Sequence, residues 1–479
     1  MRIAIIGAGP AGIAAGRELL RKGFSEFTIF DALDAPGGTW RLHSYPGLAC
    51  DVWAHSYSFS YAPNPDWSAN FVGFAEIQAY LADCATRFGL DPHMQLNTRI
   101  TRAEYTEPGH WMLESTSGPL GEFDILINAM GNQHTPLFPE VEGIDSFNGD
   151  SWHATRWNHD VPLKGKRVVV VGSAASAVQI VPEIAREAGH LTVLQRSANW
   201  IMPRGRKEYT AGQRWRFRHF PTLIKLTRWG QRMLMGQVEY AVTIGHKRMG
   251  QFEGMVEKFI NRTIDDPALR KVLLPDTRYG CKRGLVSDDF YPALNQDNVE
   301  LVAEGLARVT PAGIVTSSGR EIEADVIVYC TGYRILDYDR FDVIGRDGQN
   351  LGVVMGDEPR SHKGISVPGF PNYFFAVGPN GLVLNVSYFV TAERNVQTIV
   401  GLLCDLRSAG KQSVEVRREE FENYNKTMDS QYARFSWGAP DCHSYYTNES
   451  GHASFLFGGN FKEYRSLHEE VGLQEYEVR

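Results

Sequence analysis

Three glycines near the start of the chain are spaced for binding a phosphate group. They form the pattern Gly7-x-Gly9-x-x-Gly12 directly after the aliphatic run 3–6, and a helix is expected to begin within this pattern. The first glycine permits a tight turn, the second lets the backbone approach a pyrophosphate, and the third lets the helix pack closely on the strand. Free N–H groups at the helix N-terminus then face the phosphates. The pattern predicts a dinucleotide site.

The side chains that follow this loop bear on which dinucleotide it binds. A second strand, 27–30, ends at Asp31, and a carboxylate there accepts hydrogen bonds from an unphosphorylated ribose and repels a 2′-phosphate. The stretch PGGTW then brings Gly38, Thr39 and Trp40 close to the expected adenosine site. A loop of this composition favours FAD over the smaller NAD, although the glycine pattern alone leaves both open.

A second glycine pattern, Gly172-x-Ala174-x-x-Ala177, follows the buried strand 168–171. Its two alanines narrow the approach of the backbone, so this pattern is weaker than the first. The next strand ends near Arg196 with no acidic residue, and a cation at this place favours a 2′-phosphate, hence NADPH. Other side chains expected to contact NADPH are Ser173, Ser176, Gln179 and Ser197.

Two such sites in one chain imply an α/β protein with two Rossmann-like domains, in which hydride passes from NADPH to a bound flavin. Further buried strands are expected at 324–330 and 372–377, the latter followed by a helix to about residue 406, so the FAD domain is expected to be discontinuous. The predicted segments are 1–150 and 331–479 for the FAD domain, 151–208 and 275–330 for the NADPH domain, and 209–274 for a helical insertion.

The predicted insertion 209–274 has many Arg and Lys residues among Trp, Phe, Leu, Ile and Met, with apolar positions at helical spacing. Three interpretations remain open. The helices cover a substrate entrance, they pack on the nucleotide domain with a solvated basic face, or they contact a membrane surface weakly.

The composition of the whole chain narrows the functional class. The 479 residues are 43% hydrophobic and carry a formal net charge of −7, so there is no overall basic field of the kind expected for nucleic-acid binding. No apolar run is long enough to predict a transmembrane helix. The six cysteines form no C-x-x-C pair, which predicts buried free thiols, no metal site and a cytoplasmic protein.

The segment between the two nucleotide loops resembles the fingerprint of class B flavoprotein monooxygenases in its Baeyer–Villiger form. Phe147-x-Gly149-x-x-x-His153-x-x-x-Trp157 matches F-x-G-x-x-x-H-x-x-x-W, and the N- and S-oxygenating relatives usually have Tyr or Phe in place of Trp157. Further stretches resemble the family in the same order and cover nearly the whole chain: GGTW, YPGLACD, YSFS, LQRSANW, YGCKRGLVSDDFYPALNQDNVEL, YCTGY, VPGFPNYFFAVGPN and SYYTNESG.

The resemblance implies that NADPH reduces FAD, that oxygen adds to form a flavin peroxide, and that a ketone is converted to an ester or lactone. It maps the active-site arginine onto Arg283, the aspartate that orients it onto Asp51, and a 2′-phosphate contact onto Lys282. It also places Tyr57, in YSFS, at the FAD site. A fixed guanidinium can stabilise a developing oxyanion. His153 and Trp157 are interpreted as interdomain contacts that couple NADPH binding to the flavin site.

Departures from the family pattern keep other activities open. Ala49 stands where an arginine is common, Asn158 replaces Pro or Asp, and Asp31 replaces the commoner Glu. The alternatives are an N- or S-oxygenating or hydroxylating flavin monooxygenase, a flavin-dependent reductase, and a nucleotide-binding redox sensor without turnover. The lack of a closely spaced cysteine pair argues against the reductase. The expected partners are a small apolar substrate and molecular oxygen.

Overall fold

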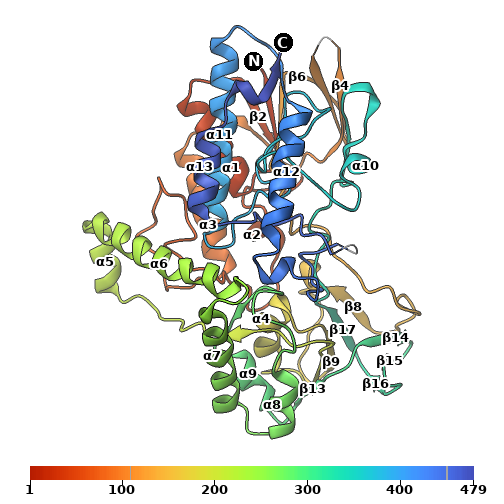
Figure 1. Ribbon diagram of the computed structural model, residues 1–479. Coiled ribbons are helices and arrows are strands. Elements are labelled where there is room, and N and C mark those ends of the chain that lie inside the picture. The colour runs from red at the N-terminus through yellow and green to blue at the C-terminus, as the bar shows by residue number, and fades with distance from the viewer. Residues whose placement is uncertain (108, 449–450) are drawn as a thin grey trace.

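The computed structural model describes residues 1–107, 109–448 and 451–479. Two parallel sheets organise the chain, one in each half of the molecule as seen in Figure 1. Short aliphatic runs form their central strands because both faces of each sheet are covered. This mixed α/β architecture with two parallel sheets confirms the predicted fold class.

The first sheet has the strand order β19-β7-β1-β2-β3. Its strands are β1 (Ile3–Ile6), β2 (Phe27–Phe30), β3 (Met94–Gln95), β7 (Ile125–Asn128) and β19 (Tyr373–Phe375). Ile3 of β1 pairs with Phe27 and with Ile125, in parallel register on both sides. Strand β19 comes from far along the chain, so both ends of the sequence contribute to this sheet.

Helices from both ends of the chain cover the first sheet. Helix α1 (Pro10–Arg21) packs against α11 (Tyr388–Ser408) and α3 (Phe74–Arg87). A second, mainly antiparallel sheet lies beside them, formed by β4 (Ile100–Thr106), β5 (His110–Ser115), β6 (Gly118–Phe123) and β18 (Asp342–Ile344). The remaining elements of this half are α2 (Thr39–Leu42), α10 (Leu351–Met355), α12 (Arg418–Tyr432), α13 (Phe461–Glu469), β20 (Val414–Val416) and β21 (Tyr476–Val478).

The second parallel sheet has the order β13-β10-β9-β17-β8. Its strands are β8 (Asp150–His153), β9 (Arg167–Val171), β10 (His190–Leu194), β13 (Val299–Val302) and β17 (Val326–Tyr329). Helices α4 (Ala175–Ile184) and α9 (Phe290–Leu294) pack together beside it. A three-stranded sheet of β14 (Leu306–Thr310), β15 (Gly313–Thr316) and β16 (Glu321–Glu323) and the pair β11 (Ile201–Met202) and β12 (Leu285–Val286) complete this half.

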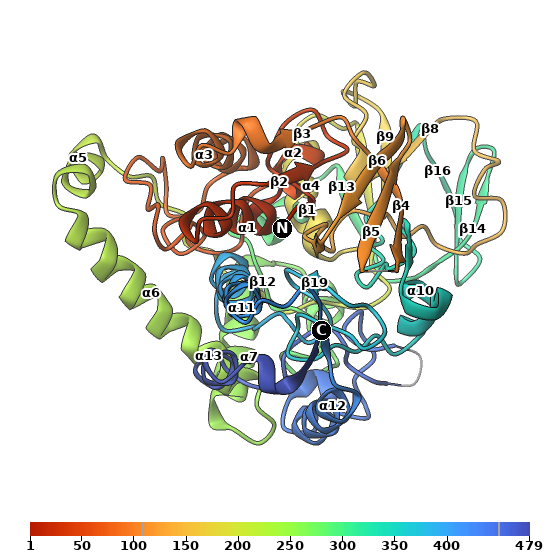
Figure 2. The same cartoon turned by 90° about the horizontal axis from the view of Figure 1, so that it is seen from above.

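The segment predicted as a helical insertion contains four helices: α5 (Ala211–His219), α6 (Pro221–Val242), α7 (Lys247–Thr263) and α8 (Pro267–Leu273). Helix α6 packs against α7 and α5. Figures 1 and 2 show α6 running along the outside of the molecule, with α5 at its far end. The helical prediction for this segment is therefore confirmed, while the exact domain boundaries stay a prediction.

Candidate active site

The first glycine loop adopts the conformation that its sequence pattern requires. Gly7 has φ +111°, and a Cβ there would lie 2.5 Å from the carbonyl oxygen of Ala129. A Cβ on Gly12 would lie 1.8 Å from the carbonyl oxygen of Gly7, so the helix packs on the strand end with no room for a side chain. Gly9 faces Gly38 of the PGGTW stretch, whose Cβ would come 3.0 Å from the Gly9 Cα. The loop thus has the tight, side-chain-free backbone that a pyrophosphate site requires.

Asp31 lies at the end of β2 and is tied to this loop. Its Oδ2 accepts a hydrogen bond from the Ala8 N–H at 2.6 Å, and its Oδ1 accepts one from the Leu33 N–H at 2.8 Å. Burial raises the pKa of this carboxyl group, against the effect of the two N–H donors. Asp31 therefore also holds the glycine loop in place, a role that the sequence pattern did not reveal.

Trp40 and Tyr57, both predicted to contact FAD, lie together. The Trp40 indole donates from Nε1 to the Tyr57 hydroxyl oxygen at 3.2 Å, and the two rings meet edge-to-face at 5.5 Å. Phe389 at the start of α11 packs on Tyr57 at 4.8 Å. Thr39 lies beside Trp40 at the start of α2, directly after Gly38. These residues form an aromatic wall next to the first loop.

A small pocket opens at the carboxyl ends of β7 and β19, the edge at which parallel sheets bind ligands. Arg340 lines it and was not predicted from the sequence, since a single arginine without a motif gives no signal. Its Nη2 donates to the carbonyl oxygen of Gly131 at 2.5 Å, and burial lowers the pKa of its guanidinium. The pocket and the glycine loop lie at the carboxyl ends of strands of the same sheet, the edge at which a dinucleotide cofactor such as FAD binds in sheets of this kind.

The second nucleotide loop, which begins at Gly172, repeats the tight turn of the first loop, with alanines in place of the second and third glycines. Gly172 has φ +108°, and a Cβ there would lie 2.6 Å from the carbonyl oxygen of Cys330. Ala174 precedes α4 at the N-cap position and is exposed, while Ala177 is buried against the sheet. Ser173 is buried, and its carbonyl oxygen accepts a hydrogen bond from the Asn199 amide at 3.1 Å.

Gln179 joins the two halves of the molecule. Its Nε2 donates to the carbonyl oxygen of Ala49 at 2.9 Å, and its Oε1 accepts from the Tyr45 hydroxyl at 3.1 Å. Tyr45 also lies close to Ser176. Burial raises the pKa of the Tyr45 phenol, and the hydrogen bond with Ser176 acts in the opposite direction. Gln179 and Ser176 thus lie where α4 meets the YPGLACD stretch, a contact that the sequence pattern did not predict.

The cations predicted for a 2′-phosphate gather at the end of β10. The Lys282 ammonium donates to the Ser197 hydroxyl at 2.6 Å. Burial lowers the pKa of Lys282, and the neighbouring charge of Arg196 also lowers it, while the Asp276 carboxylate acts in the opposite direction. Because two cations at close range repel, an anion placed between Arg196 and Lys282 would relieve this repulsion.

Arg283 and Asp51 form an ion pair between the two halves. The Nε and Nη2 atoms of Arg283 donate to Oδ2 of Asp51 at 3.0 and 2.6 Å. The carboxylate charge is the largest cause of the raised pKa of Arg283. Tyr445 and Tyr446, whose ring centroids are 4.2 Å apart, lie near this guanidinium. The arginine is therefore charged, oriented and bordered by aromatic rings.

The sequence F-x-G-x-x-x-H-x-x-x-W contributes the edge strand β8. His153 is buried, its Nδ1 contacts the Thr155 hydroxyl at 3.0 Å, and burial lowers its pKa to about 4. The His153 ring meets Tyr333 at 6.2 Å, in the connection that leads back to the first half. Trp157 packs edge-to-face on Trp152 at 5.5 Å. Gly149 has no room for a side chain, since a Cβ would lie 2.5 Å from the Asp325 carbonyl oxygen.

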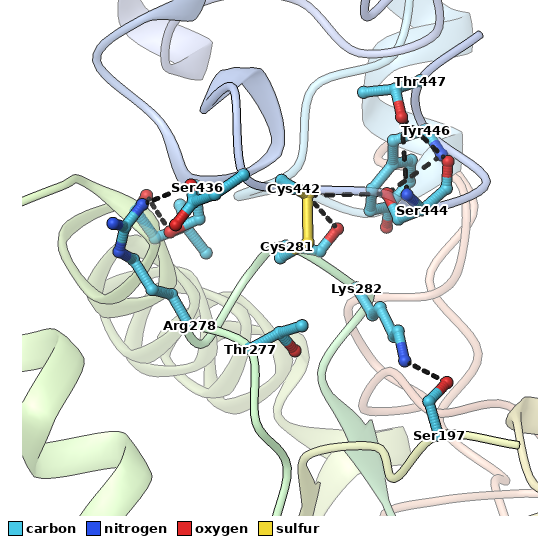
Figure 3. Close-up of a disulfide and its surroundings, with 12 residues drawn as sticks. Ser197, Thr277, Arg278, Cys281, Lys282, Ser436, Cys442, Ser444, Tyr446 and Thr447 are labelled. Atoms are coloured by element: carbon cyan, nitrogen blue, oxygen red, sulfur yellow. Dashed lines mark hydrogen bonds and ion pairs between the residues drawn. A yellow bond between two sulfur atoms is a disulfide. The ribbon is translucent and has the colours of Figure 1, made fainter. Parts of the chain in front are cut away.

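The expectation of six free thiols is wrong for two cysteines. Cys281 and Cys442 form a disulfide across 161 residues, while the other four, Cys50, Cys84, Cys330 and Cys404, are free. Figure 3 shows the disulfide on one side of the loop and Lys282 pointing to Ser197 on the other. Local spacing rules find only close cysteine pairs, so a pair brought together by the fold was missed.

Within the described ranges 1–107, 109–448 and 451–479, no helix has both the length and the apolar character needed to cross a bilayer. In the same residues no group of three or more His, Cys, Asp or Glu side chains is placed to hold a metal ion.

Comparison with known proteins assigns the family. A family model described as FMO-like, flavin-binding monooxygenase-like, matches residues 1–343. A Baeyer-Villiger monooxygenase of Streptomyces coelicolor is 37% identical over 484 residues, which cover 100% of this chain and 92% of the relative. One of Pseudomonas aeruginosa is 35% identical over 480 residues, covering 100% and 91%.

Solved structures agree with these relatives. Oxidized steroid monooxygenase bound to NADP has a TM-score of 0.87 at 27% identity, and the closed structure of cyclohexanone monooxygenase has a TM-score of 0.89 at 26% identity. Both comparisons cover 100% of this chain and 99% of the solved one. The family prediction is thus confirmed, and the chain belongs to the flavin-binding monooxygenases as a Baeyer–Villiger-type member.

Proposed function

We propose that this protein uses NADPH, FAD and molecular oxygen to convert a small apolar ketone into an ester or lactone. The single observation that carries the proposal is the ion pair of Arg283 with Asp51, which joins loops from the two halves of the molecule. Family membership supports the same reaction.

The residues around the two loops are proposed to hold the cofactors. The backbone of Gly7, Gly9 and Gly12 would receive the FAD pyrophosphate, and the wall of Trp40 and Tyr57 would flank the cofactor. When bound and reduced by NADPH, the flavin supplies activated oxygen. Arg340 is proposed as an additional cation at the cavity.

The basic end of β10 is proposed to bind NADPH. Arg196 and Lys282 would pair with the 2′-phosphate, and Ser197 would hold Lys282 in position. The helix N-terminus after Gly172 would face the pyrophosphate. This arrangement favours NADPH over NADH because only NADPH carries the anion that both cations can neutralise.

Arg283 is proposed as the catalytic cation. Its guanidinium would stabilise negative charge that develops on the ketone oxygen, and it needs no reorganisation because Asp51 already orients it. Asp51 acts as the positioning residue, because its carboxylate holds the planar guanidinium of Arg283 toward the half of the molecule that contains the first parallel sheet. The buried ring of Tyr446, against which the half-exposed Tyr445 packs, would exclude water from an apolar substrate.

The proposed domains are those expected from the sequence: FAD-binding at 1–150 and 331–479, NADPH-binding at 151–208 and 275–330, and the helical insertion at 209–274. The cytoplasmic location expected from the sequence is also a prediction that no observation tests directly. The disulfide of Cys281 with Cys442 argues against it, because such bonds are rare in a reducing compartment.

Oxygenation of nitrogen or sulfur is the second candidate, and Ala49 is the observation that favours it. An alanine here leaves no side-chain cation, and the Ala49 carbonyl oxygen instead accepts the Gln179 amide. A site with one cation fewer stabilises the negative charge that develops during ketone oxygenation less well. Oxygen transfer to a soft nucleophile such as nitrogen or sulfur needs less of this stabilisation.

One experiment separates the candidates. The purified holoenzyme is given NADPH and ¹⁸O₂ with matched ketones and thioethers of similar size, and products are identified by mass spectrometry. The proposal requires one ¹⁸O atom in an ester or lactone, with one NADPH consumed for each product formed. Sulfoxide with no ester would establish the second candidate, and hydrogen peroxide alone would point to a reductase or oxidase.

A further inference from the structure

Helix α6 exposes apolar side chains on the face that points away from the protein. Its inner face is buried through Ile224 and Gln231, and the Gln231 Oε1 accepts a hydrogen bond from the Ser56 hydroxyl at 2.6 Å. On the same inner side, Arg228 donates to the Ser58 hydroxyl oxygen at 2.8 Å. A helix anchored in this way normally presents polar residues to water on its outer face.

The outer face of α6 instead presents apolar side chains to water. Leu226, Trp229 and Met233 lie on it at helical spacing and are 58%, 64% and 55% exposed. Leu234 beside them is also exposed, so four large apolar side chains share one stripe. Single exposed apolar residues are ordinary, but a continuous stripe on one helix marks an interaction surface. The other large exposed apolar residues of α5 and α6 are Trp215, Phe220, Leu223 and Tyr240.

The charges around this stripe have one sign. Residues 211–238 contain six Lys and Arg residues and no Asp or Glu, in a chain whose formal net charge is −7. Of these six, Arg228 lies on the inner face and Arg218 pairs with Asp66 at 2.5 Å, which leaves four cations for the outer surface. Lys225 and Arg232 are exposed and flank Trp229 along one side of the stripe. Arg214 and Arg216 add positive charge on α5. The outer surface is therefore both apolar and basic.

We propose that the outer face of α5 and α6 binds peripherally to an anionic lipid membrane. Apolar side chains in the acyl boundary and cations at the headgroups are the combination that interfacial helices use, and Trp is favoured at that depth. Figures 1 and 2 show α5 and α6 at the outer margin of the molecule, where a flat surface can reach them. The inference is independent of the proposed reaction.

A second copy of the chain is the competing occupant. A symmetric contact would bring the same patch of each copy together, so Lys225 and Arg232 of both would meet with no acidic residue in 211–238 to pair with them. An anionic bilayer instead complements both the charge and the apolar stripe. The charge pattern therefore favours lipid over self-association.

The test measures binding of the holoenzyme to vesicles by co-sedimentation. Wild-type protein is expected to bind vesicles of mixed phosphatidylglycerol and phosphatidylcholine, to bind pure phosphatidylcholine much more weakly, and to be released as ionic strength rises. The variant Leu226→Ser/Trp229→Ser/Met233→Ser and the variant Lys225→Gln/Arg232→Gln should each weaken binding on the order of tenfold.

Matched controls lie on other surfaces. Val353→Ser/Val354→Ser removes two exposed apolar residues of α10, and Lys426→Gln/Lys462→Gln removes two exposed charges of α12 and α13. Both controls should bind anionic vesicles like the wild type. Quenching of tryptophan emission by brominated lipid should decrease in Trp229→Phe, which places that ring in the bilayer without relying on a loss of binding.

The proposal is overturned if wild-type protein fails to bind anionic vesicles, or if the two α6 variants bind as well as the controls. It is also overturned if sedimentation velocity shows a dimer that the triple variant dissociates while no form binds lipid, because the second copy would then be the occupant. Unchanged flavin content in every variant shows that a loss of binding is not a loss of folding.

Discussion

The guanidinium of Arg283 and the carboxylate of Asp51 meet at 2.6 Å across 232 residues of sequence. One residue earlier, Lys282 contacts Ser197, so adjacent side chains of one loop reach the proposed NADPH site and the flavin half of the molecule. This placement would let a single loop contact both the proposed NADPH site and the proposed substrate site.

Replacing Arg283 with alanine should abolish most product formation. Removing a preorganised cation from a developing oxyanion costs about 10²–10³ in kcat. Asp51→Asn should have a smaller effect, because the guanidinium stays present but loses the charge that orients it. Ester formation and anaerobic reduction of the flavin by NADPH are measured separately.

The matched control is Arg278→Ala in the same loop, because Arg278 pairs with Asp441 at 2.8 Å and points away from the proposed site. Its rate should stay close to that of the wild type. If Arg278→Ala and Arg283→Ala lose product to the same extent, the effect lies in the loop and not in the catalytic cation.

Replacing Lys282 with alanine should reduce the preference for NADPH. Loss of one charge-assisted hydrogen bond to a phosphate costs about 1.5–3 kcal/mol, which is roughly a ten- to hundredfold rise in the KM for NADPH. The KM for NADH should hardly change, since NADH lacks the 2′-phosphate. Arg196→Ala should act in the same direction, and steady-state kinetics with both nucleotides measures the ratio. Equal losses with NADPH and NADH would exclude the 2′-phosphate role.

His153→Ala should lower the yield of product per NADPH consumed. The His153 ring is buried on β8 and contacts Tyr333, which lies in the connection between the two sheets. A smaller side chain would leave space at this junction and loosen the contact between the halves. Hydrogen peroxide release is measured together with product. Unchanged coupling would show that His153 is a structural residue only.

How far the sequence predicts this molecule depends on whether the signal is local. Strands β1 and β2 have the predicted bounds, because short aliphatic runs next to glycine turns leave few alternatives. The contact of Gln179 with Ala49 and the cavity lining of Arg340 were not predictable, since both depend on how two halves pack. Arg283 and Asp51 were paired by resemblance alone, and the ion pair is what the structure adds.

The disulfide is another contact that local sequence patterns could not predict, and its effect on stability can be tested. Cys281→Ser or Cys442→Ser should lower the free energy of unfolding by about 2–4 kcal/mol, because the link closes a long loop in the unfolded chain. Cys404→Ser, at a free and partly exposed thiol, is the control and should have little effect. Chemical denaturation measures the difference.

The disulfide itself is tested by alkylating denatured protein without reductant. Four cysteines should be labelled and Cys281 and Cys442 should be protected until reductant is added. Labelling of all six in protein kept oxidised would contradict the disulfide. Protection in protein extracted directly from the cytoplasm would show that the bond persists there despite the reducing conditions.

Acid should destabilise the fold through buried histidines, and His55 offers a direct test. It is buried, neither ring nitrogen has a hydrogen-bond partner among the described residues, and burial lowers its pKa from 6.5 to about 4. Because the unfolded chain binds a proton more readily than the folded one, the stabilising effect is complete above pH 6.5 and is lost as pH falls towards 4.

The variant His55→Phe should therefore lose less stability than the wild type between pH 6.5 and pH 4, by on the order of 2 kcal/mol. Phe217, 4.5 Å from the His55 ring, and Tyr209 provide an aromatic environment that accepts a phenyl ring. Urea unfolding at several pH values measures the difference, with the exposed His443→Phe as the control. If both variants follow the wild-type pH dependence, the imidazole of His55 is accommodated in its charged form, and burial alone does not keep it neutral.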